Sequence, residues 1–315
     1  MNKSLTLSAC LALVIFCCSC FEMQANKNET ALNDPNSRRR MNAISSSTPL
    51  DVLVKICRNE KEEDIRHKAV SYIFDHNILL EIVQKKEETA LVRGSALRRL
   101  NDPQLAIKFA ANIEDKSIRP AAVECIPIAE QKLLENYAEN DPDYMVRFYA
   151  IPRIKNQDLI FKILKNEKHN FVRLAAAESL LNQNYISELI FSESDEKVKS
   201  AMVRNLYRID LLTKLALTDS DRYNRGTAAS KLSDQKILEK IVEVDPESFP
   251  REKAIVRLKN IEIIEKVAAA DPQENVRKAA ISVLTNKELL KSIYKNDPEL
   301  RIRCAAENRL KEIAK

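Results

Sequence analysis

Residue types that commonly perform catalysis or bind metals are few in this chain and widely spaced. The 315 residues include three histidines, His67, His76 and His169, and none has the spacing of a zinc-binding motif such as HExxH. The serine run at 45–47 has no recognisable catalytic partner, and tryptophan is absent, which weakens an interpretation as an enzyme that stacks a nucleobase. We therefore predict no catalytic residues, no metal and no cofactor, and interpret the chain as non-enzymatic.

Cysteines are the remaining nucleophiles, and four of the seven precede residue 21. The other three, Cys57, Cys125 and Cys304, are far apart in the sequence. A disulfide needs Cα atoms within about 7 Å, whereas packed helices alone are separated by about 10 Å. We therefore expect small buried apolar roles for these three cysteines rather than disulfides or metal ligation.

The segment 1–20 has the order of a secretory signal. A short basic start at Met1–Lys3 precedes an apolar run from Leu5 to Phe16, and small or polar residues return at Cys17–Cys20. A membrane-spanning helix needs about 20 apolar residues, so the run is too short to cross a bilayer. This pattern predicts that residues 1–20 direct export and are removed.

The residues Cys17-Cys18-Ser19-Cys20 resemble the lipobox of bacterial lipoproteins. In that family a small residue precedes the cysteine that is lipidated and becomes the new N-terminus; Ser19 and Cys20 match, whereas Cys17 stands where leucine is usual. The resemblance implies a lipid on Cys20 and a membrane-anchored chain in the periplasm or outer envelope of a bacterium. Ordinary cleavage near Ala25 is the alternative.

Residues 21–48 are polar, rich in asparagine and serine, and contain the triplet Arg38-Arg39-Arg40. Such composition is typical of a chain that does not bury enough apolar surface to fold, so it predicts a flexible tether. The arginines would then either contact anionic lipid headgroups or form a solvated charge run. We favour the solvated run.

The totals favour an all-helical repeat protein. The chain has 2 glycines, too few for a protein built on β-hairpins or Gly-rich phosphate loops, while 45% of its residues are hydrophobic. The 51 basic and 46 acidic residues nearly cancel to a net charge of +5, which makes nucleic acid an unlikely partner. A chain of this length is long for one compact core but ordinary for a repeat array.

A basic residue recurs at an almost constant spacing, and we call it the frame residue. Seven of the nine spacings between successive frame residues equal 26, and the others are 27 and 28. Such self-similarity is the signature of a stacked repeat architecture. The ten frame residues are Arg66, Arg93, Arg119, Arg147, Arg173, Lys199, Arg225, Arg251, Arg277 and Arg303.

Apolar residues keep the same register. Alanine follows the frame residue by three positions in nine units, and isoleucine or leucine follows it by seven positions in all ten. The residue before the frame residue is apolar in eight units; Asn224 and Pro250 depart. These offsets form one apolar helix face, and a larger residue in place of the alanine should overpack the contact.

An earlier helix precedes each frame helix. Apolar residues recur ten and thirteen positions before the frame residue, and Asp-Pro pairs at 141, 245, 271 and 297 mark the turn between the two helices. Aspartate supplies a capping oxygen and proline suits a first helical turn. Residues 49–315 thus predict ten helix pairs.

Acidic residues share the register of the basic ones. An acidic residue lies six positions before the frame residue in nine units; Ile113, beside Glu114, is the exception. The recurrence predicts a structural ladder of ion pairs between repeats rather than an active site. Its main members are Asp141, Arg147, Arg173, Asp219, Arg225, Asp245, Arg251, Asp271, Arg277, Asp297 and Arg303.

The motif acid-Pro-x-x-x-Val-Arg-x-x-Ala-x-x-x-Leu, as at 271–284, resembles HEAT repeats, and the short period is similar to that of the leucine-rich repeat variant. The resemblance covers residues 49–315 and implies an all-α, right-handed α-solenoid. These families mostly act as scaffolds for proteins, peptides or nucleic acid, and a few resemble base-excision enzymes or chromophore lyases. Their motif residues are structural, so the resemblance assigns no catalytic position.

Aromatic residues concentrate between residues 137 and 207, which hold 9 of the 17 in the chain. Tyr144, Phe148, Tyr149 and Phe171 are the candidate partner-binding residues, since exposed aromatic side chains often anchor interfaces. Local variation of the core is the alternative.

Basic residues also recur six positions after the frame residue, at Arg99, Arg153, Lys231, Arg257 and Arg309. Helix C-termini favour cations there. An anion-binding stripe is the less favoured interpretation.

Architecture and leader together predict a non-catalytic scaffold or adaptor that binds a protein or peptide in the cell envelope. One alternative is an enzyme or enzyme subunit, lyase-like, on the same solenoid. A nucleic-acid-binding solenoid is a further alternative, which export and the balanced charge disfavour.

Overall fold

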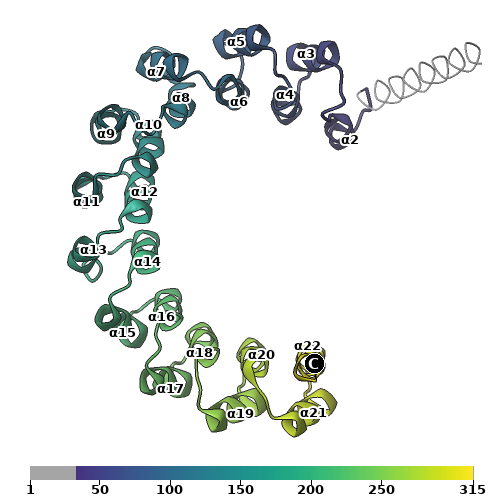
Figure 1. The fold of residues 1–315 in the computed structure, drawn as a ribbon, viewed down its shortest axis with the longest axis vertical. Helices are drawn as coiled ribbons and strands as arrows, with labels where there is room; N and C mark the ends of the chain where they lie inside the picture. The colour runs from purple at the N-terminus through teal and green to yellow at the C-terminus, as the bar shows by residue number, and fades with distance from the viewer. Residues whose placement is uncertain (1–32, 315) are drawn as a thin grey trace, which may run out of the picture. The chain divides into compact units, whose positions relative to one another are not determined.

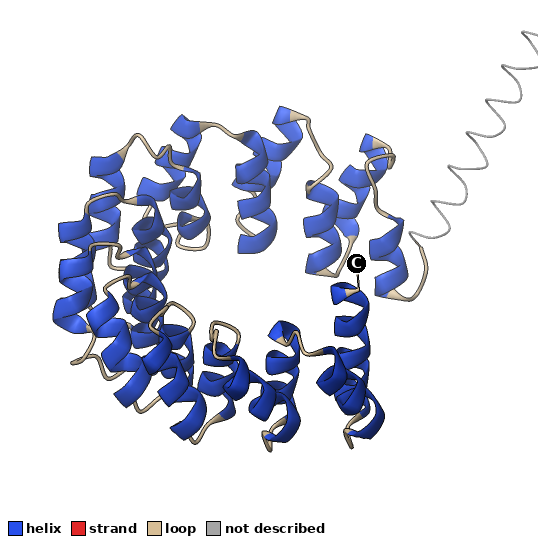
Figure 2. Ribbon diagram, turned by 60° about the horizontal axis from the view of Figure 1, so that its bottom comes forward, coloured by secondary structure: helices blue, strands red, loops and turns tan. Residues whose placement is uncertain are grey.

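Helices account for all regular structure in residues 33–314, the part of the chain that this computed structural model describes (Figures 1 and 2). Two compact units are present; unit 1 ends at Arg153 and unit 2 begins at Ile154. Cys20, the predicted signal segment and the first part of the predicted tether lie outside the described residues. None of the described helices has the length and apolar character needed to cross a membrane.

Unit 1 contains four helix pairs preceded by one further helix. Its first helices are α3 (Leu50–Asn59), α5 (His76–Gln84), α7 (Pro103–Ala111) and α9 (Gln131–Asn140). Its second helices are α4 (Glu63–Val70), α6 (Ala90–Leu100), α8 (Arg119–Cys125) and α10 (Tyr144–Ala150), the last extended by a 3-10 turn at Ile151–Arg153. The additional helix is α2 (Ser37–Ala43).

Unit 2 contains six helix pairs. Its first helices are α11 (Gln157–Asn166), α13 (Gln183–Leu189), α15 (Ile209–Thr218), α17 (Gln235–Val244), α19 (Ile261–Ala270) and α21 (Lys287–Asn296). Its second helices are α12 (Asn170–Ser179), α14 (Glu196–Asn205), α16 (Arg222–Ala229), α18 (Ser248–Ile255), α20 (Glu274–Val283) and α22 (Leu300–Ile313). The predicted all-α solenoid of ten helix pairs is therefore confirmed.

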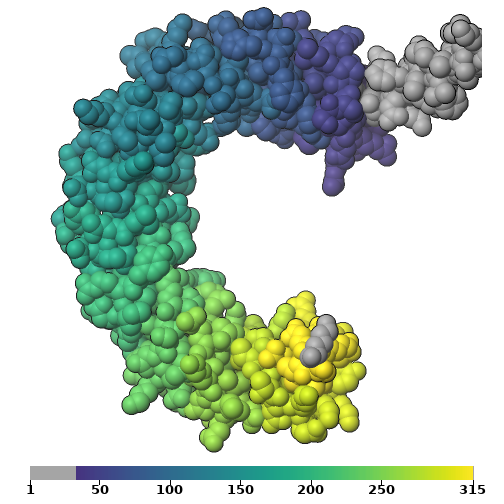
Figure 3. All heavy atoms as spheres, viewed as in Figure 1, coloured from purple at the N-terminus to yellow at the C-terminus, as the bar shows by residue number. Residues whose placement is uncertain are grey.

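Each helix pair packs mainly on the pairs next to it in the sequence, as the successive colour bands within each unit show (Figure 3). The second helices of a unit contact one another in a continuous row. The small residue three positions after the frame residue permits this close approach. Ala228, Ala254 and Ala280 hold that position in unit 2 and are fully buried. The apolar register read from the sequence is thus the core of the solenoid.

The frame residues connect the turn of their own repeat to the following repeat through hydrogen bonds and ion pairs. Nη1 of Arg225 donates to the carbonyl oxygens of Asp219 and Ser220, and Nε and Nη2 donate to the two carboxylate oxygens of Asp245 at 2.8 and 3.0 Å. Asp245 Oδ1 also accepts the backbone N–H of Glu247. One guanidinium therefore satisfies the carbonyls of its own turn and the acid of the next, and the fork geometry of arginine suits both tasks.

The same arrangement recurs within both units. In unit 2 the ion pairs that follow this pattern are Arg173–Glu193, Lys199–Asp219, Arg225–Asp245, Arg251–Asp271 and Arg277–Asp297. Arg147 and Arg303 donate Nη1 to the carbonyls of Asp141 and Asp297, each at 2.8 Å.

Two ladder partners in unit 1 differ from the spacing-based prediction. Arg66 pairs with Glu88 at 2.8 Å rather than with Glu87, and Arg93 pairs with Asp115 at 2.5 Å rather than with Glu114. In both turns the acid that reaches the guanidinium lies one or two places closer to the next frame residue than the usual offset of six. The local path of the turn therefore selects which of two adjacent acids forms the ion pair.

Residues 37–48 also differ from the predicted flexible tether. α2 contacts α4, Ile44 and Thr48 are buried, and Arg40 forms a bidentate ion pair with Glu60 at 2.9 and 3.1 Å. Arg40 precedes Arg66 by one repeat period, so α2 occupies the place of a second helix in a preceding repeat. The solenoid therefore begins before residue 49.

The three cysteines of the described residues are free thiols. Cys57 is buried, and its burial raises the pKa of the thiol to about 12. Cys304 is exposed on α22, so the expected buried role is wrong for that residue.

Candidate functional site

Three of the sequence-predicted aromatic residues lie on α10 in unit 1, and the fourth, Phe171, lies on α12 in unit 2. Phe148 and Tyr149 on α10 are half-buried and meet edge to face, with ring centroids 5.2 Å apart. Tyr144, on the same helix, is partly exposed. Phe171 belongs to unit 2, where it is 59% exposed and lies 5.7 Å from the His169 ring. Of the four, Phe148 and Tyr149 are in direct ring contact.

Phe171 lines a groove of about 830 Å³ between the N-terminal turns of α12 and α14. Leu174 lies on the α12 side, and Asp195 and Lys197 lie on the α14 side. An exposed aromatic ring beside a cation is a combination that interfaces favour. This groove is the first part of the surface of unit 2 that we consider as a candidate binding site.

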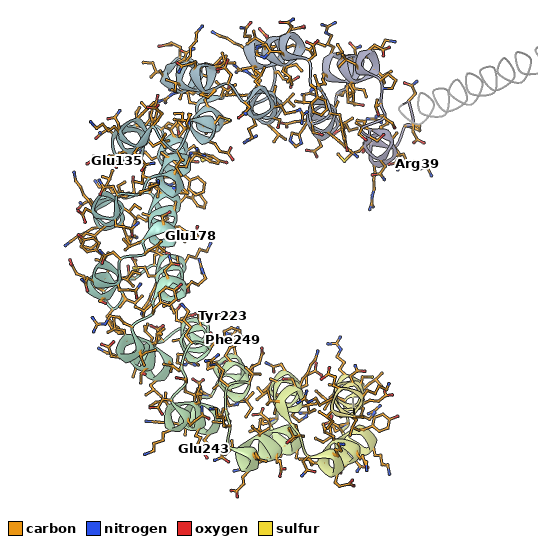
Figure 4. The ribbon with its side chains drawn as sticks, in the orientation of Figure 1. Arg39, Glu135, Glu178, Tyr223, Glu243 and Phe249 are labelled. Atoms are coloured by element: carbon orange, nitrogen blue, oxygen red, sulfur yellow. The ribbon has the colours of Figure 1, made fainter. Side chains whose placement is uncertain are left out.

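A second aromatic feature lies farther along unit 2, outside the residues predicted from the sequence. Tyr223 of α16 and Phe249 of α18 lie side by side, with ring centroids 5.2 Å apart and ring planes at 58° (Figure 4). Tyr223 is 52% exposed, and Phe249 is half-buried. The two rings are therefore in direct contact at a tilted angle, and Tyr223 presents the more exposed one.

Gly226 permits this arrangement. A Cβ atom at residue 226 would lie 2.3 Å from Cδ1 of Phe249, which is far inside van der Waals contact. The ring of Phe249 therefore rests on the α16 backbone, and it could not do so if residue 226 were alanine. This requirement gives the glycine a packing role within a helix, where it otherwise lowers stability.

A charged side chain lies over each of the two rings. Cζ of Arg222 lies 5.0 Å from the Tyr223 ring centroid, and Nζ of Lys253 lies 4.9 Å from the Phe249 centroid. Arg222 also donates to Tyr223 Oη and to Glu247 Oε2, each at 3.2 Å, and these hydrogen bonds raise the pKa of its guanidinium. Cation–π contacts of this kind help to fix the orientation of the rings.

A hydrogen-bonded carboxylate links this feature to α20. Glu252 accepts from Lys253 Nζ and from Asn275 Nδ2, both at 2.9 Å. Burial alone would raise the pKa of Glu252, but these two hydrogen bonds outweigh it, and the pKa is lowered. The carboxylate is therefore ionised at neutral pH with its charge matched locally.

One position of the repeat is common to the aromatic rings described above and to Asn275. It lies two residues before the frame residue, on the exposed side of the second helices. We call this series the minus-two row; its members are Phe171, Lys197, Tyr223, Phe249, Asn275 and Arg301. It contains aromatic rings and hydrogen-bond donors but no carboxylate. This row could have been found in the sequence, because its members are identified by counting two positions back from each frame residue.

The basic residues six positions after the frame residue have a structural role. Lys231 Nζ donates to the carbonyl oxygens of Val203 and Leu206 at 3.1 and 3.0 Å, and Arg257 Nε donates to that of Leu232 at 2.7 Å. They therefore donate to carbonyl oxygens at and just beyond the C-terminal end of the preceding second helix, where the macrodipole favours a cation. Burial lowers the pKa of Lys231.

A glutamine ladder was not predicted from the sequence, although it has the same period. Gln183 donates Nε2 to the Asn205 carbonyl at 3.0 Å and accepts the backbone N–H of Tyr207 at 2.7 Å, so it clamps the loop between repeats. Gln157 and Gln235 make equivalent contacts. The glutamines at 131, 157, 183 and 235 are separated by one or two repeat periods, which was the available signal.

Metal-binding geometry does not occur in the part of the chain that the structure describes: no group of three or more His, Cys, Asp or Glu side chains lies close enough together to hold an ion. His67 and His76 belong to α4 and α5, and His169 precedes α12.

Comparison with known proteins supports the fold. No family model matches the sequence, and no curated protein matches it. A solved structure described as a leucine-rich repeat variant with a novel repetitive structural motif is 24% identical, with a TM-score of 0.51, over 69% of this chain and 86% of that one. This similarity shows that the chain folds as a helical repeat solenoid.

Proposed function

We propose that this chain is a non-catalytic scaffold that binds a protein or peptide on the second-helix side of its repeats. The minus-two row of unit 2 supports the proposal, because it places exposed aromatic rings and hydrogen-bond donors in a regular series. Stacked repeats provide extended surfaces of this kind for partner binding. The periodic arginines and acids are engaged in holding adjacent repeats together, so they are not the binding groups.

The proposed location is the cell envelope of a bacterium, with the mature chain anchored by a lipid on Cys20. The leader and the resemblance to a lipobox support this part. With α2 folded onto α4, about a dozen residues would separate Cys20 from the first described residue, Asn33.

Partner capture from bacterial envelope extract tests the scaffold. The full chain, carrying a C-terminal tag, is expected to retain a saturable protein or peptide partner, and Tyr223→Ala should weaken capture at least tenfold, as loss of a central aromatic anchor does. Tyr207→Ala is the matched control, since Tyr207 is also exposed but lies outside the minus-two row. The binding site would instead lie on α10 if no substitution in the minus-two row changed capture and the double substitution Phe148→Ala with Tyr149→Ala abolished it.

Lipidation has its own test. The full chain expressed in a bacterium is expected to incorporate labelled fatty acid, and Cys20→Ala should abolish the label and move the protein from the membrane to the soluble envelope fraction. Cys17→Ala is the control and should keep the label, because Cys17 stands outside the modified position. An unlabelled, unmodified chain in the cytoplasm would refute the envelope proposal.

A further inference from the structure

The loops that join successive repeats of unit 2 form one edge of the solenoid. We define this loop edge by two positions of each loop, eight and ten residues after the frame residue. Its members are Lys155, Gln157, Leu181, Gln183, Tyr207, Ile209, Ser233, Gln235, Lys259, Ile261, Thr285 and Lys287. Every charged residue among them is a lysine.

Hydrogen bonds hold neighbouring loops of this edge against one another. The Gln183 amide donates to the Leu181 carbonyl at 3.0 Å and accepts the backbone N–H of Tyr207 at 2.7 Å. Nζ of Lys231 donates to the Leu206 carbonyl at 3.0 Å, which joins the next pair of loops. Equivalent contacts recur in the following repeats, so the loops from residue 181 to residue 259 form a continuous edge.

Large apolar side chains project from the middle of the loop edge. Leu181, Tyr207 and Ile209 are 60, 69 and 55% exposed, and they belong to two adjacent loops. Nζ of Lys231 lies 4.9 Å from the centroid of the Tyr207 ring, so a cation rests against this ring. Neighbouring apolar side chains that remain this exposed mark an interaction site.

The charges of these loops favour an anionic partner. Lys259 and Lys287 are exposed on the loop edge itself. Five acidic residues of the same loops lie outside the two defining positions, and four of them have a local partner. Asp158 accepts from Tyr185 Oη, Asp210 and Glu288 form ion pairs with Arg208 and Lys291, Asp234 caps α17, and Glu262 lines a groove between α17 and α19.

The opposite edge of unit 2, formed by the turns within the repeats, has the opposite character. An acidic residue stands there six positions before each frame residue, and a second stands four positions before it at residues 195, 221, 247 and 299. The frame residues match most of the first set with ion pairs, but the second set adds further negative charge. An anionic surface would therefore attract the loop edge and repel the turn edge.

The interface of a lipid bilayer favours this combination of side chains. A tyrosine ring is stable at the level of the headgroups, where one end of the side chain is apolar and the other is wet, and lysines near the surface are attracted to anionic lipids. Projecting side chains can enter this soft layer without a shaped recess, whereas a protein partner would have to provide one.

We propose that the loop edge of unit 2 docks on an anionic lipid bilayer, with Leu181, Tyr207 and Ile209 inserted among the headgroups and Lys259 and Lys287 facing lipid phosphates. Folded residues make this contact, so it is separate from the proposed lipid on Cys20. It also leaves the minus-two row available to a partner.

Tryptophan is absent from the sequence, so Tyr207→Trp places a single fluorescent reporter on the loop edge. The test uses the full chain with Cys20→Ala, which prevents lipidation, and vesicles of phosphatidylglycerol with phosphatidylethanolamine or of phosphatidylcholine alone. With the anionic vesicles we expect a blue shift of the emission and quenching by brominated lipid. With phosphatidylcholine we expect neither.

Tyr223→Trp is the matched control, because Tyr223 is also an exposed aromatic residue of unit 2 but lies in the minus-two row. It should respond to neither kind of vesicle. The signal comes from one side chain, so attachment of the chain through residues 1–20 does not imitate it. No response at residue 207, an equal response at residues 207 and 223, or an equal response to both kinds of vesicle overturns the inference.

Variants of the Tyr207→Trp chain separate the apolar and charged contributions. Leu181→Ser with Ile209→Ser, and Lys259→Glu with Lys287→Glu, should each raise the lipid concentration at half-maximal response at least tenfold. The substituted side chains are exposed, so the fold is kept, which circular dichroism checks.

Two controls match these variants. Val244→Ser removes an exposed apolar side chain at the turn edge, and Lys240→Glu with Lys266→Glu makes the same charge change on α17 and α19. Both should have a clearly smaller effect. Equal weakening by a variant and its control overturns the inference.

The outcomes separate membrane docking from the scaffold proposal. If partner capture depends on Tyr223 while the reporter at residue 207 does not respond, the scaffold stands and the membrane contact is wrong. If the reporter responds while no envelope partner is captured, the membrane contact stands and the scaffold is wrong. If Tyr207→Ala lowers partner capture while the reporter does not respond to vesicles, the loop edge binds a protein and the lipid inference is wrong.

Discussion

Replacing Arg93 by alanine is expected to lower the free energy of unfolding by about 3–5 kcal/mol, because it leaves a buried carboxylate without its partner. The Arg93 side chain is 1% exposed. Its Nε donates to the Val83 carbonyl at 2.8 Å, and Nη1 and Nη2 donate to Asp115 at 2.9 and 2.5 Å. Loss of the guanidinium would therefore leave the Asp115 carboxylate without its counter-charge, with the Ser117 hydroxyl still donating to Oδ1, and would remove the donor to the Val83 carbonyl.

Hydrogen exchange resolved by peptide is the suitable measurement, since repeat arrays can open locally and one global midpoint can miss the event. Protection should fall most in α6, α7 and α8. Arg58→Ala is the control: Arg58 and Glu81 are each 57% exposed, and such a pair contributes less than about 1 kcal/mol. Equal effects of Arg93→Ala and Arg58→Ala would contradict the ladder as the main link between repeats.

The Arg93–Asp115 ion pair also makes the local stability of this region depend on pH in the acid range. The hydrogen bond from Arg93 holds the pKa of Asp115 below its ordinary value, against the opposing effect of burial. A carboxyl whose pKa is lowered by folding stabilises the protein above its unfolded pKa, and this stability is lost as pH falls through the folded pKa. Local opening of α6–α8 should therefore increase below about pH 4. In Arg93→Met with Asp115→Leu, which replaces the pair by apolar side chains, that acid step should disappear.

The solenoid was predictable from the sequence because each structural task recurs at a fixed offset. The frame arginine, the buried alanine and the leucine seven residues later each recur in nearly every unit, so a comparison of the chain with itself at that period reveals them. The exact partner was less predictable where the turn changes its path: Glu88 and Asp115, rather than their acidic neighbours, reach the arginines. Spacing identifies the position of a turn, but its backbone decides which carboxylate points inward.

The candidate surface was less predictable for a different reason. Aromatic density directed attention to residues 137–207, yet Phe148 and Tyr149 there are half-buried and in contact with each other. The pair at Tyr223 and Phe249 depends on a contact between neighbouring repeats and on the missing Cβ at Gly226. Such a contact joins residues one repeat period apart, so it is visible only when exposed positions are aligned to the frame as carefully as buried ones.

Composition alone predicts a tether before residue 49, whereas residues 37–43 form α2. The asparagines, serines and arginine triplet are typical of a tether, but Asp34-Pro35, Arg40, Ala43 and Ile44 occupy the turn, frame, alanine and apolar positions of the repeat. Arg40 Nη1 donates to the Asp34 carbonyl at 2.9 Å, as the other frame arginines do in their turns. The match to four positions of the repeat is therefore a better predictor of the structure of this segment than its mean polarity.

A chain beginning at residue 49 should accordingly lose about 3 kcal/mol of local stability in α3 and α4, whereas a chain beginning at residue 33 should not. Deletion of α2 removes the buried side chain of Ile44, and burial of an isoleucine is worth about 1.5–3 kcal/mol. It also leaves Glu60 without Arg40, and Lys68 Nζ without the Met41 carbonyl that it contacts at 2.7 Å.

Hydrogen exchange of α3 and α4 in the two shortened chains measures the difference, and Arg40→Ala in the full chain separates the ion pair from the apolar contact. We expect protection to fall most when α2 is absent, to fall by a smaller amount in Arg40→Ala, and to stay unchanged in the chain that begins at residue 33. Equal protection with and without residues 33–48 would mean that α2 adds nothing to the array, and residues 21–48 would then act as the tether that their composition predicts. Because α2 fills the place of a second helix and caps the apolar side of α4, the physical expectation is that the folded scaffold starts with it.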